Sequence, residues 1–341
     1  MPHPPWQLDP DVTFLNHGSF GACPRRVLEH QAMLRARLEA SPVQFMTREL
    51  APALAASRRA VAAFVGARAD DLVFVRNATE GVNVVLRSLR FQPGDELLTT
   101  SHVYPGCHQA LRFVAEQAGA EVRVVDVPFP IQSPEQVTDA LLAGVTPRTR
   151  LALLDHVTSI TGIIFPIADI ARGLRARGVA TLVDGAHAAG MLDLNIEGLG
   201  VDYYSANFHK WVCAPKGAGM LWARPELQAA LRPSVISHGY AASPEARFRE
   251  LFDWGGTSDP TAWLCLPFVL EFMQGLLPGG WAELRARNHA LALAARDLLC
   301  AAVAVPAPAP DAMLGSLVSV PLPGVGSGVR GRSDPLYTAL F

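Results

Sequence analysis

Residues 203–222 read YYSANFHKWVCAPKGAGMLW, two strand-like ends around a loop that holds Lys210 and Lys216. These are the only lysines in 341 residues, because 27 of the 29 basic side chains are arginine. A bias toward arginine explains the scarcity of lysine but not the clustering. Arginine stays protonated, whereas a desolvated lysine amine can lose its proton and attack a carbonyl carbon. The stretch therefore predicts a strand–loop–strand unit that presents a functional amine.

Short apolar runs of the same kind recur along the chain and alternate with helical patterns. This alternation predicts an α/β domain whose mainly parallel sheet is covered by helices on both faces. The active site of such a domain lies beyond the carboxyl ends of its strands. We expect strands at 72–76, 96–100, 122–127, 150–155, 180–184, 201–205 and 219–223, and helices near 80–90, 107–118, 134–143 and 166–177.

Composition changes divide the chain into three parts. Residues 1–44 form an extended arm and a helix, residues 45–235 the large α/β domain, and residues 236–341 interface helices and a smaller α+β domain. The last part looks shortened, because the chain stops one turn into a helical pattern. Its expected segments are helices at 261–277 and 280–303, a linker at 306–312, a strand at 313–322, a glycine-rich loop at 323–335 and a helix start at 336–341.

Charge and composition limit the kinds of partner. Half of the residues are hydrophobic and 18% are charged, as in a globular protein, and the net charge of −2 gives no footprint for nucleic acid or an anionic membrane. No window reaches the roughly 18 apolar residues of a membrane helix. Five cysteines without a CxxC pair indicate reduced thiols and a cytoplasmic location. A small polar substrate is the expected partner.

Three chemical groups converge where the predicted strands end. Asp184 closes the run ATLVD, and NATEGVN at 77–83 places Thr79 at a helix start, where an anion can bind. Lys210 follows the next strand. Alone, the carboxylate and the Asn-Ala-Thr turn could be simple helix caps. Together, an amine, an isolated carboxylate and a phosphate-type turn match the needs of pyridoxal phosphate (PLP).

Other catalytic motifs are missing from the sequence. It has no HExxH, GxSxG or GxxxxGK[ST] motif, and no GxGxxG follows the first strand. His102 and His108 lack a nearby third ligand. We therefore expect no metal site.

Several motifs resemble one enzyme family. FLNHGSFGACP (14–24), NATEGVN, DGAHA (184–188) and HKWVCAPKG (209–217) occur in the order found in class V, fold-type I PLP enzymes. Within these, the chain resembles the isopenicillin N epimerase-like group over about residues 12–322. The resemblance implies PLP as cofactor and a fold-type I PLP-transferase fold, with a mainly parallel seven-stranded sheet.

The resemblance also implies roles in binding the cofactor ring. Lys210 matches the lysine that forms the imine with PLP and then acts as the base at the substrate Cα. Asp184 matches the carboxylate that keeps the pyridine nitrogen protonated. His187 and Ser159 match neighbours of the phenolic oxygen, and Tyr104 matches the residue stacked on the ring. The phosphate cup matches Ala78, Thr79, Asn207 and His209.

Further matches concern the substrate and the subunit. Thr257 matches a residue that reaches the phosphate of the neighbouring subunit, which implies a homodimer. The family's arginine for the substrate carboxylate lies beyond this chain's end, so Arg48, or else Arg247 or Arg330, is the expected substitute. Lys216 is interpreted as structural. The arm that lines the substrate pocket matches Asn16, His17 and Gly18.

The reaction stays open at this stage. Epimerisation needs a second proton donor, for which Tyr104 and His102 are candidates, whereas transamination needs protonation at a cofactor carbon. The C–S lyases of ergothioneine synthesis also resemble the chain at LNHGS. A cysteine desulfurase fits less well, because the last cysteine, Cys300, lies in a helical pattern. A PLP-binding or regulatory protein without turnover is the alternative of another class.

Overall fold

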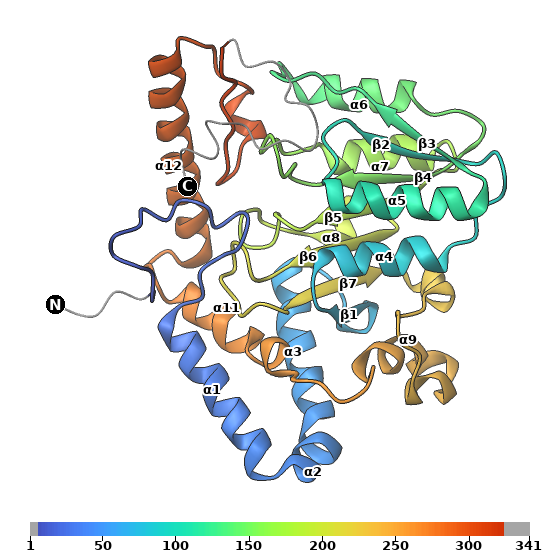
Figure 1. The fold of residues 1–341 in the computed structure, drawn as a ribbon, viewed down its shortest axis with the longest axis vertical. Coiled ribbons are helices and arrows are strands. Elements are labelled where there is room, and N and C mark those ends of the chain that lie inside the picture. The colour runs from blue at the N-terminus through green and yellow to red at the C-terminus, as the bar shows by residue number, and fades with distance from the viewer. Residues whose placement is uncertain (1–5, 324–341) are drawn as a thin grey trace.

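The computed structural model describes residues 6–323, which build one seven-stranded sheet with helices on both faces (Figure 1). The strand order is β1-β7-β6-β5-β4-β2-β3. All neighbours from β6 to β3 are parallel, and β7 runs antiparallel to both β6 and β1. The strands are β1 Leu72–Val75, β2 Glu96–Thr100, β3 Glu121–Val125, β4 Thr149–Asp155, β5 Ala180–Gly185, β6 Tyr203–Asn207 and β7 Gly219–Ala223.

The strand residues divide between two hydrophobic cores, because successive side chains point to opposite faces. Leu97, Leu151 and Leu153 pack into one core, whereas Leu98 and Leu154 pack into the other. The first core is closed by α4 Ala78–Ser88, α5 Pro105–Ala118 and α9 Pro244–Asp253. The second is closed mainly by α1 Arg25–Ala40, α3 Leu50–Val65, α6 Pro134–Ala143, α7 Ile167–Arg175, α8 Ile196–Leu199, α10 Thr261–Leu264 and α11 Leu266–Gln274.

The predicted sheet is confirmed, including its seven strands and their helical connections. The predicted strand at 313–322 is wrong. A 3-10 turn at Asp311–Met313 is followed by a single bridge between Leu314 and Ile163, and no further strand pairing continues to residue 322. This segment lies against the loop after β4, with the Ser319 hydroxyl donating to Ile160 O at 2.6 Å. It therefore meets a loop and not a strand edge.

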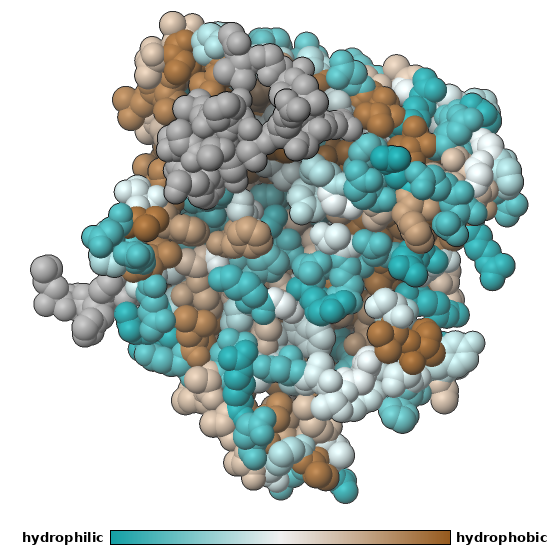
Figure 2. Space-filling view, in the orientation of Figure 1, coloured by the Kyte–Doolittle hydropathy of each residue, from teal (hydrophilic) through white to brown (hydrophobic). Residues whose placement is uncertain are grey.

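The region after residue 235 contains the expected helices. α12 Gly280–Val303 coincides with the predicted segment, while the predicted helix at 261–277 is divided into α10 and α11. Figure 2 shows hydrophobic residues along the side of the molecule that α12 occupies, and its exposed leucines include Leu291 and Leu298. Within residues 6–323, no helix has the length and apolar character needed to cross a membrane. The glycine-rich loop and the helix expected at 336–341 fall outside the described residues from position 324 onward.

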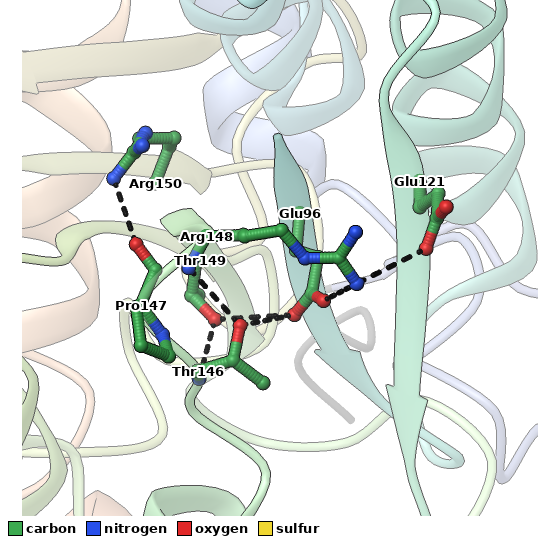
Figure 3. A network of polar contacts seen from close by, with 7 residues as sticks. All are labelled: Glu96, Glu121, Thr146, Pro147, Arg148, Thr149 and Arg150. Atoms are coloured by element: carbon green, nitrogen blue, oxygen red, sulfur yellow. Dashed lines mark hydrogen bonds and ion pairs between the residues drawn. The ribbon is translucent and has the colours of Figure 1, made fainter. Parts of the chain in front are cut away.

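A polar network joins the amino ends of β2, β3 and β4 (Figure 3). Glu96, which is 2% exposed, accepts hydrogen bonds from the Arg148 guanidinium at 2.6 Å and from the Thr146 hydroxyl at 2.8 Å. Arg148 also reaches Glu121 on the edge strand β3, at 3.7 Å. The network stabilises the edge of the sheet that lies opposite the carboxyl ends of these strands. The functional groups gather at those carboxyl ends.

Candidate active site

Most of the predicted site residues meet in a cavity of about 330 Å³ at the carboxyl ends of β4, β5 and β6. The strand register explains the convergence, since Asp155 pairs with Asp184 and Asn207 is the last residue of β6. The loops after these parallel strands open at one edge of the sheet. The lining comprises Asn16, Gly18, Ser19, Phe20, Asn77, Thr79, Tyr104, Asp155, Val157, Ser159, Asp184, Ala186, His187, Asn207, His209, Lys210 and Leu317.

Lys210 projects its amine toward His187 from the loop between β6 and β7. Lys210 Nζ lies 2.9 Å from His187 Nε2, and the Trp211 indole N–H donates to His187 Nδ1 at 3.4 Å. Since Nδ1 accepts the indole proton, this arrangement assigns the imidazole proton to Nε2. In that tautomer, a hydrogen bond from Nε2–H to Lys210 Nζ forms only with the unprotonated amine. The structure thus presents Lys210 as a nucleophile.

Burial favours the neutral form of both partners in this contact. Desolvation lowers the pKa of Lys210, although the carboxylates of Asp184 and Asp155 oppose the change. Burial, and then the nearby Lys210 charge, lowers the pKa of His187 to about 3. The imidazole is therefore neutral at physiological pH. It acts on its neighbours through hydrogen bonds and not through a positive charge.

Two buried carboxyl groups lie side by side on the neighbouring strands β4 and β5. Asp184 is 3% exposed and Asp155 is 2% exposed, and burial raises the pKa of both groups. Asp184 accepts the Ala186 backbone N–H at 3.0 Å, and Asp155 accepts the Tyr104 N–H at 3.4 Å. A cation in the cavity, such as a protonated heterocycle, would offset the cost of their charge.

Cys107 forms a second contact to the Asp184 carboxylate. It is fully buried in the first turn of α5, and its thiol donates to Asp184 Oδ2 at 3.1 Å. With the Ala186 N–H on Oδ1, both carboxylate oxygens have a donor. Cys107 thereby fixes the orientation of Asp184.

The amino end of α4 is held against the end of β6. The Ala78 N–H donates to Asn207 Oδ1 at 2.7 Å, and Asn77 caps the helix by accepting the Glu80 N–H at 2.9 Å. Gly81 allows this approach, because a Cβ atom there would collide with the Ser205 hydroxyl on β6. A helix amino end at this position favours an anionic group in the cavity.

Two orphaned polar atoms show that the cavity suits a polar cofactor. Ser159 Oγ and His209 Nδ1 are buried and have no hydrogen-bond partner among the described residues, although both residues line the cavity. Such groups are costly unless a ligand satisfies them. The free amine, the paired carboxyls, the helix amino end and these two atoms together fit PLP.

The structure leaves several predicted residues outside the cavity lining. His17 accepts the Ala22 N–H through Nδ1 at 3.3 Å, although its neighbours Asn16 and Gly18 face the cavity. Thr257 lines a separate hollow of about 500 Å³. Arg48 is exposed on the π-helix Phe45–Glu49, and Arg247 donates to Ala242 O. Arg330 lies outside the described residues.

Ala78 does not line the cavity either, and a further candidate that the structure places elsewhere is His102. Its ring nitrogens contact the Thr161 hydroxyl at 2.7 Å and Val127 O at 2.9 Å, and it does not line the cavity. Of the two proton donors considered for epimerisation, only Tyr104 faces the cavity.

Sequence reasoning missed several cavity residues or their partners, among them Asp155, Cys107 and Leu317. Asp155 had a readable signal, since the β4 run ends in LLD much as the β5 run ends in LVD. Cys107 had none, because a cysteine in the first turn of a helix is usually a small buried hydrophobe. Leu317 comes from the segment that was expected to form a strand.

A doubly covered, mainly parallel sheet with a lysine, a carboxylate and a helix amino end at its carboxyl edge defines a fold-type I PLP enzyme. The chain belongs to the class V aminotransferase family, whose sequence model matches residues 22–328. It is a PLP-dependent enzyme of that class.

Individual relatives carry different activities in their names. The chain is 37% identical to isopenicillin N epimerase of Amycolatopsis lactamdurans, over 86% of this chain and 76% of that protein. It is 32% identical to a probable chloroplastic L-cysteine desulfhydrase of Arabidopsis thaliana, over 98% of this chain and 73% of that protein.

Among solved structures, the chain is similar to C-DES in a mutant form with glycine covalently linked to the PLP cofactor. The TM-score is 0.72 and the identity 25%, with 85% of this chain and 77% of that chain covered. The likeness to a solved structure with bound PLP agrees with the fit of the cofactor to this cavity.

Proposed function

We propose that this enzyme removes the Cα proton of an amino-acid substrate, as an isopenicillin N epimerase-like epimerase or aminotransferase. An epimerase returns a proton to Cα, whereas an aminotransferase delivers it to a carbon of the cofactor. The observation that carries the proposal is the Lys210 amine, whose Nζ lies 2.9 Å from His187 Nε2 in a cavity that also holds Asp184. A neutral amine in this position can bond a carbonyl carbon and can later take a proton.

The chain's own residues divide the work of binding and proton transfer. When bound, PLP withdraws electrons from the substrate Cα and so makes its proton removable. Asp184, fixed by Cys107 and Ala186, would hold the proton on the ring nitrogen. His187 Nε2–H and the Ser159 hydroxyl would donate to the phenolic oxygen. Lys210 would hold the cofactor and then accept the Cα proton.

Tyr104 supports epimerisation as the first choice of reaction. Inversion requires a second group that returns a proton to the opposite side of Cα, and the Tyr104 hydroxyl belongs to a side chain that faces the cavity and is 41% exposed. The 37% identity to an isopenicillin N epimerase agrees with this choice.

A C–S lyase activity is the second candidate. A relative named as an L-cysteine desulfhydrase matches 98% of this chain. Lyase activity needs the same base at Cα but a substrate with a leaving group on Cβ, so the cavity residues described above serve both reactions. The substrate decides between them.

One experiment separates the reactions. The PLP-loaded protein is incubated in deuterated water with a panel of amino acids that includes cysteine, and Cα exchange, stereochemical inversion, sulfide or pyruvate release and amino transfer are followed together. Exchange with inversion supports an epimerase, whereas release of pyruvate supports the lyase. The absence of exchange and product with every amino acid would contradict action at Cα.

The assignment of the amine has its own test. Borohydride reduction should fix the cofactor to the wild-type chain and to Lys216→Ala, but not to Lys210→Ala. Peptide mass mapping locates the adduct. An adduct in Lys210→Ala that disappears in Lys216→Ala would reverse the assignment.

We further propose that the enzyme is a cytoplasmic homodimer. Thr257 lies on an exposed stretch away from this chain's cavity, as expected if Thr257 of the partner subunit reaches the cofactor phosphate. Exposed apolar side chains, including Val235, Ile236 and Tyr240, precede that stretch and favour association.

Arg48 stays the proposed partner of the substrate carboxylate. The free, buried cysteines fit a reducing compartment. Sedimentation equilibrium tests the dimer.

A further inference from the structure

The wall of the cavity includes a short turn, residues 16–21, that belongs to neither a helix nor a strand. Asn16, Gly18, Ser19 and Phe20 line the cavity from this turn. Its shape is set by Asn16, whose Oδ1 accepts the Ser19 N–H at 3.0 Å and whose Nδ2 donates to Ser19 Oγ at 2.9 Å. These two hydrogen bonds lie within the turn, so they do not fix its position relative to the sheet.

The turn is placed by its contact with the lysine-bearing loop. Gly21 packs directly on the backbone of that loop, and a Cβ atom at Gly21 would collide with the carbonyl oxygens of His209 and Lys210. Glycine is thus required for this approach. Any shift of residue 21 changes the distance between the cavity-lining turn and the Lys210 amine.

The ammonium group of Lys216 holds this contact together. Lys216 Nζ, on the loop, donates to Gly21 O, on the arm, at 2.6 Å. Lys216 and Lys210 lie on the same loop between β6 and β7, so one lysine anchors the arm on the segment that carries the other. The Trp6 indole N–H donates to Ala22 O at 3.3 Å, but both residues belong to the arm, so this bond does not tie the arm to the loop.

We propose that Lys216 is a positioning residue that holds the turn 16–21 against the Lys210 loop and thereby sets the width of the substrate end of the cavity. The kinetic part of the proposal rests on the proposed function, whereas the structural part does not. A lysine suits this task because its compact ammonium reaches a single carbonyl oxygen, whereas a planar guanidinium is built for bidentate acceptors.

The experiment compares hydrogen–deuterium exchange of Lys216→Met and wild-type holoenzyme. Peptides covering residues 14–24 should exchange about tenfold faster or more in Lys216→Met, as expected when a hydrogen bond from a charged donor is lost. Peptides of the sheet and of α12 should keep their exchange rates. Lys216→Arg should restore protection only in part.

The kinetic readout is a change in KM with little change in kcat, since Lys216 does not touch the reacting atoms in this proposal. Gly21→Ala provides a second variant, because it displaces the same turn while leaving the ammonium in place. It should give the same exchange and the same rise in KM. The matched control is Arg177→Met, which removes a cationic donor to the Gly173 carbonyl at the end of α7.

The outcomes are distinct. Unchanged exchange at residues 14–24 in Lys216→Met would overturn the proposal whatever the enzyme's substrate is. Loss of kcat or of the cofactor's absorbance with an unaltered arm would also overturn it and place Lys216 in the chemistry. If the arm of Lys216→Met exchanges faster but the wild-type enzyme does not act on amino acids, the anchoring role of Lys216 is supported and the proposed function is rejected.

Discussion

At the scale of single residues, the cavity combines one amine with two carboxyl groups that burial keeps out of water. Asp155 and Asp184 are neighbours in the strand register, and each raises the cost of charging the other. Asp184 has two donors and a role toward the cofactor ring. Asp155 also accepts from the backbone, at Tyr104 and Ser159, yet burial and then the neighbouring Asp184 raise its pKa well above the ordinary value, so the folded chain tolerates its charge poorly.

We expect Asp155→Asn to stabilise the cofactor-free protein at neutral pH. Burial, followed by the charge of Asp184, raises the pKa of Asp155 well above its ordinary value. A raised pKa contributes stability that is complete below the unfolded value of about 4 and is lost as the pH rises through the folded value. The variant should therefore gain about 1 kcal/mol or more at pH 7.5, measured by urea denaturation.

The same variant should gain little at pH 4, where the carboxyl is protonated in the folded state and about half protonated in the unfolded state. Asp139→Asn, at an exposed position of α6, is the control and should change stability little at either pH. Equal stabilisation by Asp155→Asn at both pH values would show that charge is not the cause.

Cys107 permits a second prediction about the same carboxylates. The Cys107 thiol lowers the pKa of Asp184 by donating to it, although burial raises that pKa more. Cys107→Ala should therefore make Asp184 more basic and move the pH midpoint of the bound cofactor's absorbance upward by roughly half to one unit, as for a hydrogen bond worth about 1 kcal/mol. Cys107→Ser keeps a donor and should stay near wild type; equal shifts in both variants would contradict the role.

The residues that sequence could predict are those with chemistry that a cofactor demands. Lys210 and Asp184 follow from the rarity of lysine and from the position of a carboxylate after a buried strand. Cys107 and Lys216 could not be read in this way, because their roles are to orient Asp184 and to anchor Gly21. Those roles depend on contacts between segments distant in sequence.

At the scale of elements, the apolar runs of the sheet were readable because parallel strands are buried on both faces. The segment at 313–322 has the same apolar texture, yet only Leu314 makes a bridge. Pairing depends on a neighbouring edge, which a local pattern does not contain. Helix α3 was not predicted either, since its many alanines give a weak amphipathic contrast. The division at residues 44 and 235 stays a prediction.

The polar network at the amino ends of the strands should contribute measurably to stability. Glu96→Ala removes an acceptor shared by Arg148 and Thr146 at a buried position, so we expect a loss of about 2 kcal/mol in the free energy of unfolding. Urea denaturation of the cofactor-free protein measures it. Glu121→Ala is the control, because Glu121 is exposed and lies 3.7 Å from Arg148. Its loss should stay below about 0.5 kcal/mol, and an equal loss in both variants would contradict the importance of burial.

At the scale of the whole molecule, buried imidazoles should make the cofactor-free protein sensitive to acid. Burial is the first cause that lowers the pKa of His156 to about 4, of His187 to about 3 and of His209 to about 4. A lowered pKa contributes stability that is complete above the unfolded value of about 6.5 and is lost as the pH falls toward the folded value. Asp155 and Asp184 act in the opposite direction, because their pKa values are raised.

Three imidazoles against two carboxyls should give a net fall in the free energy of unfolding between pH 6.5 and pH 4.5. Each proton that the unfolded chain binds in excess adds a slope of about 1.4 kcal/mol per pH unit. His156→Asn removes one such group while keeping an acceptor for the Tyr204 hydroxyl, which contacts His156 Nδ1 at 2.7 Å. The variant should therefore show a shallower fall than wild type in urea denaturation across this range. A wild-type stability that rises on acidification would show that the two carboxyls, and not the imidazoles, govern the acid response of the empty cavity.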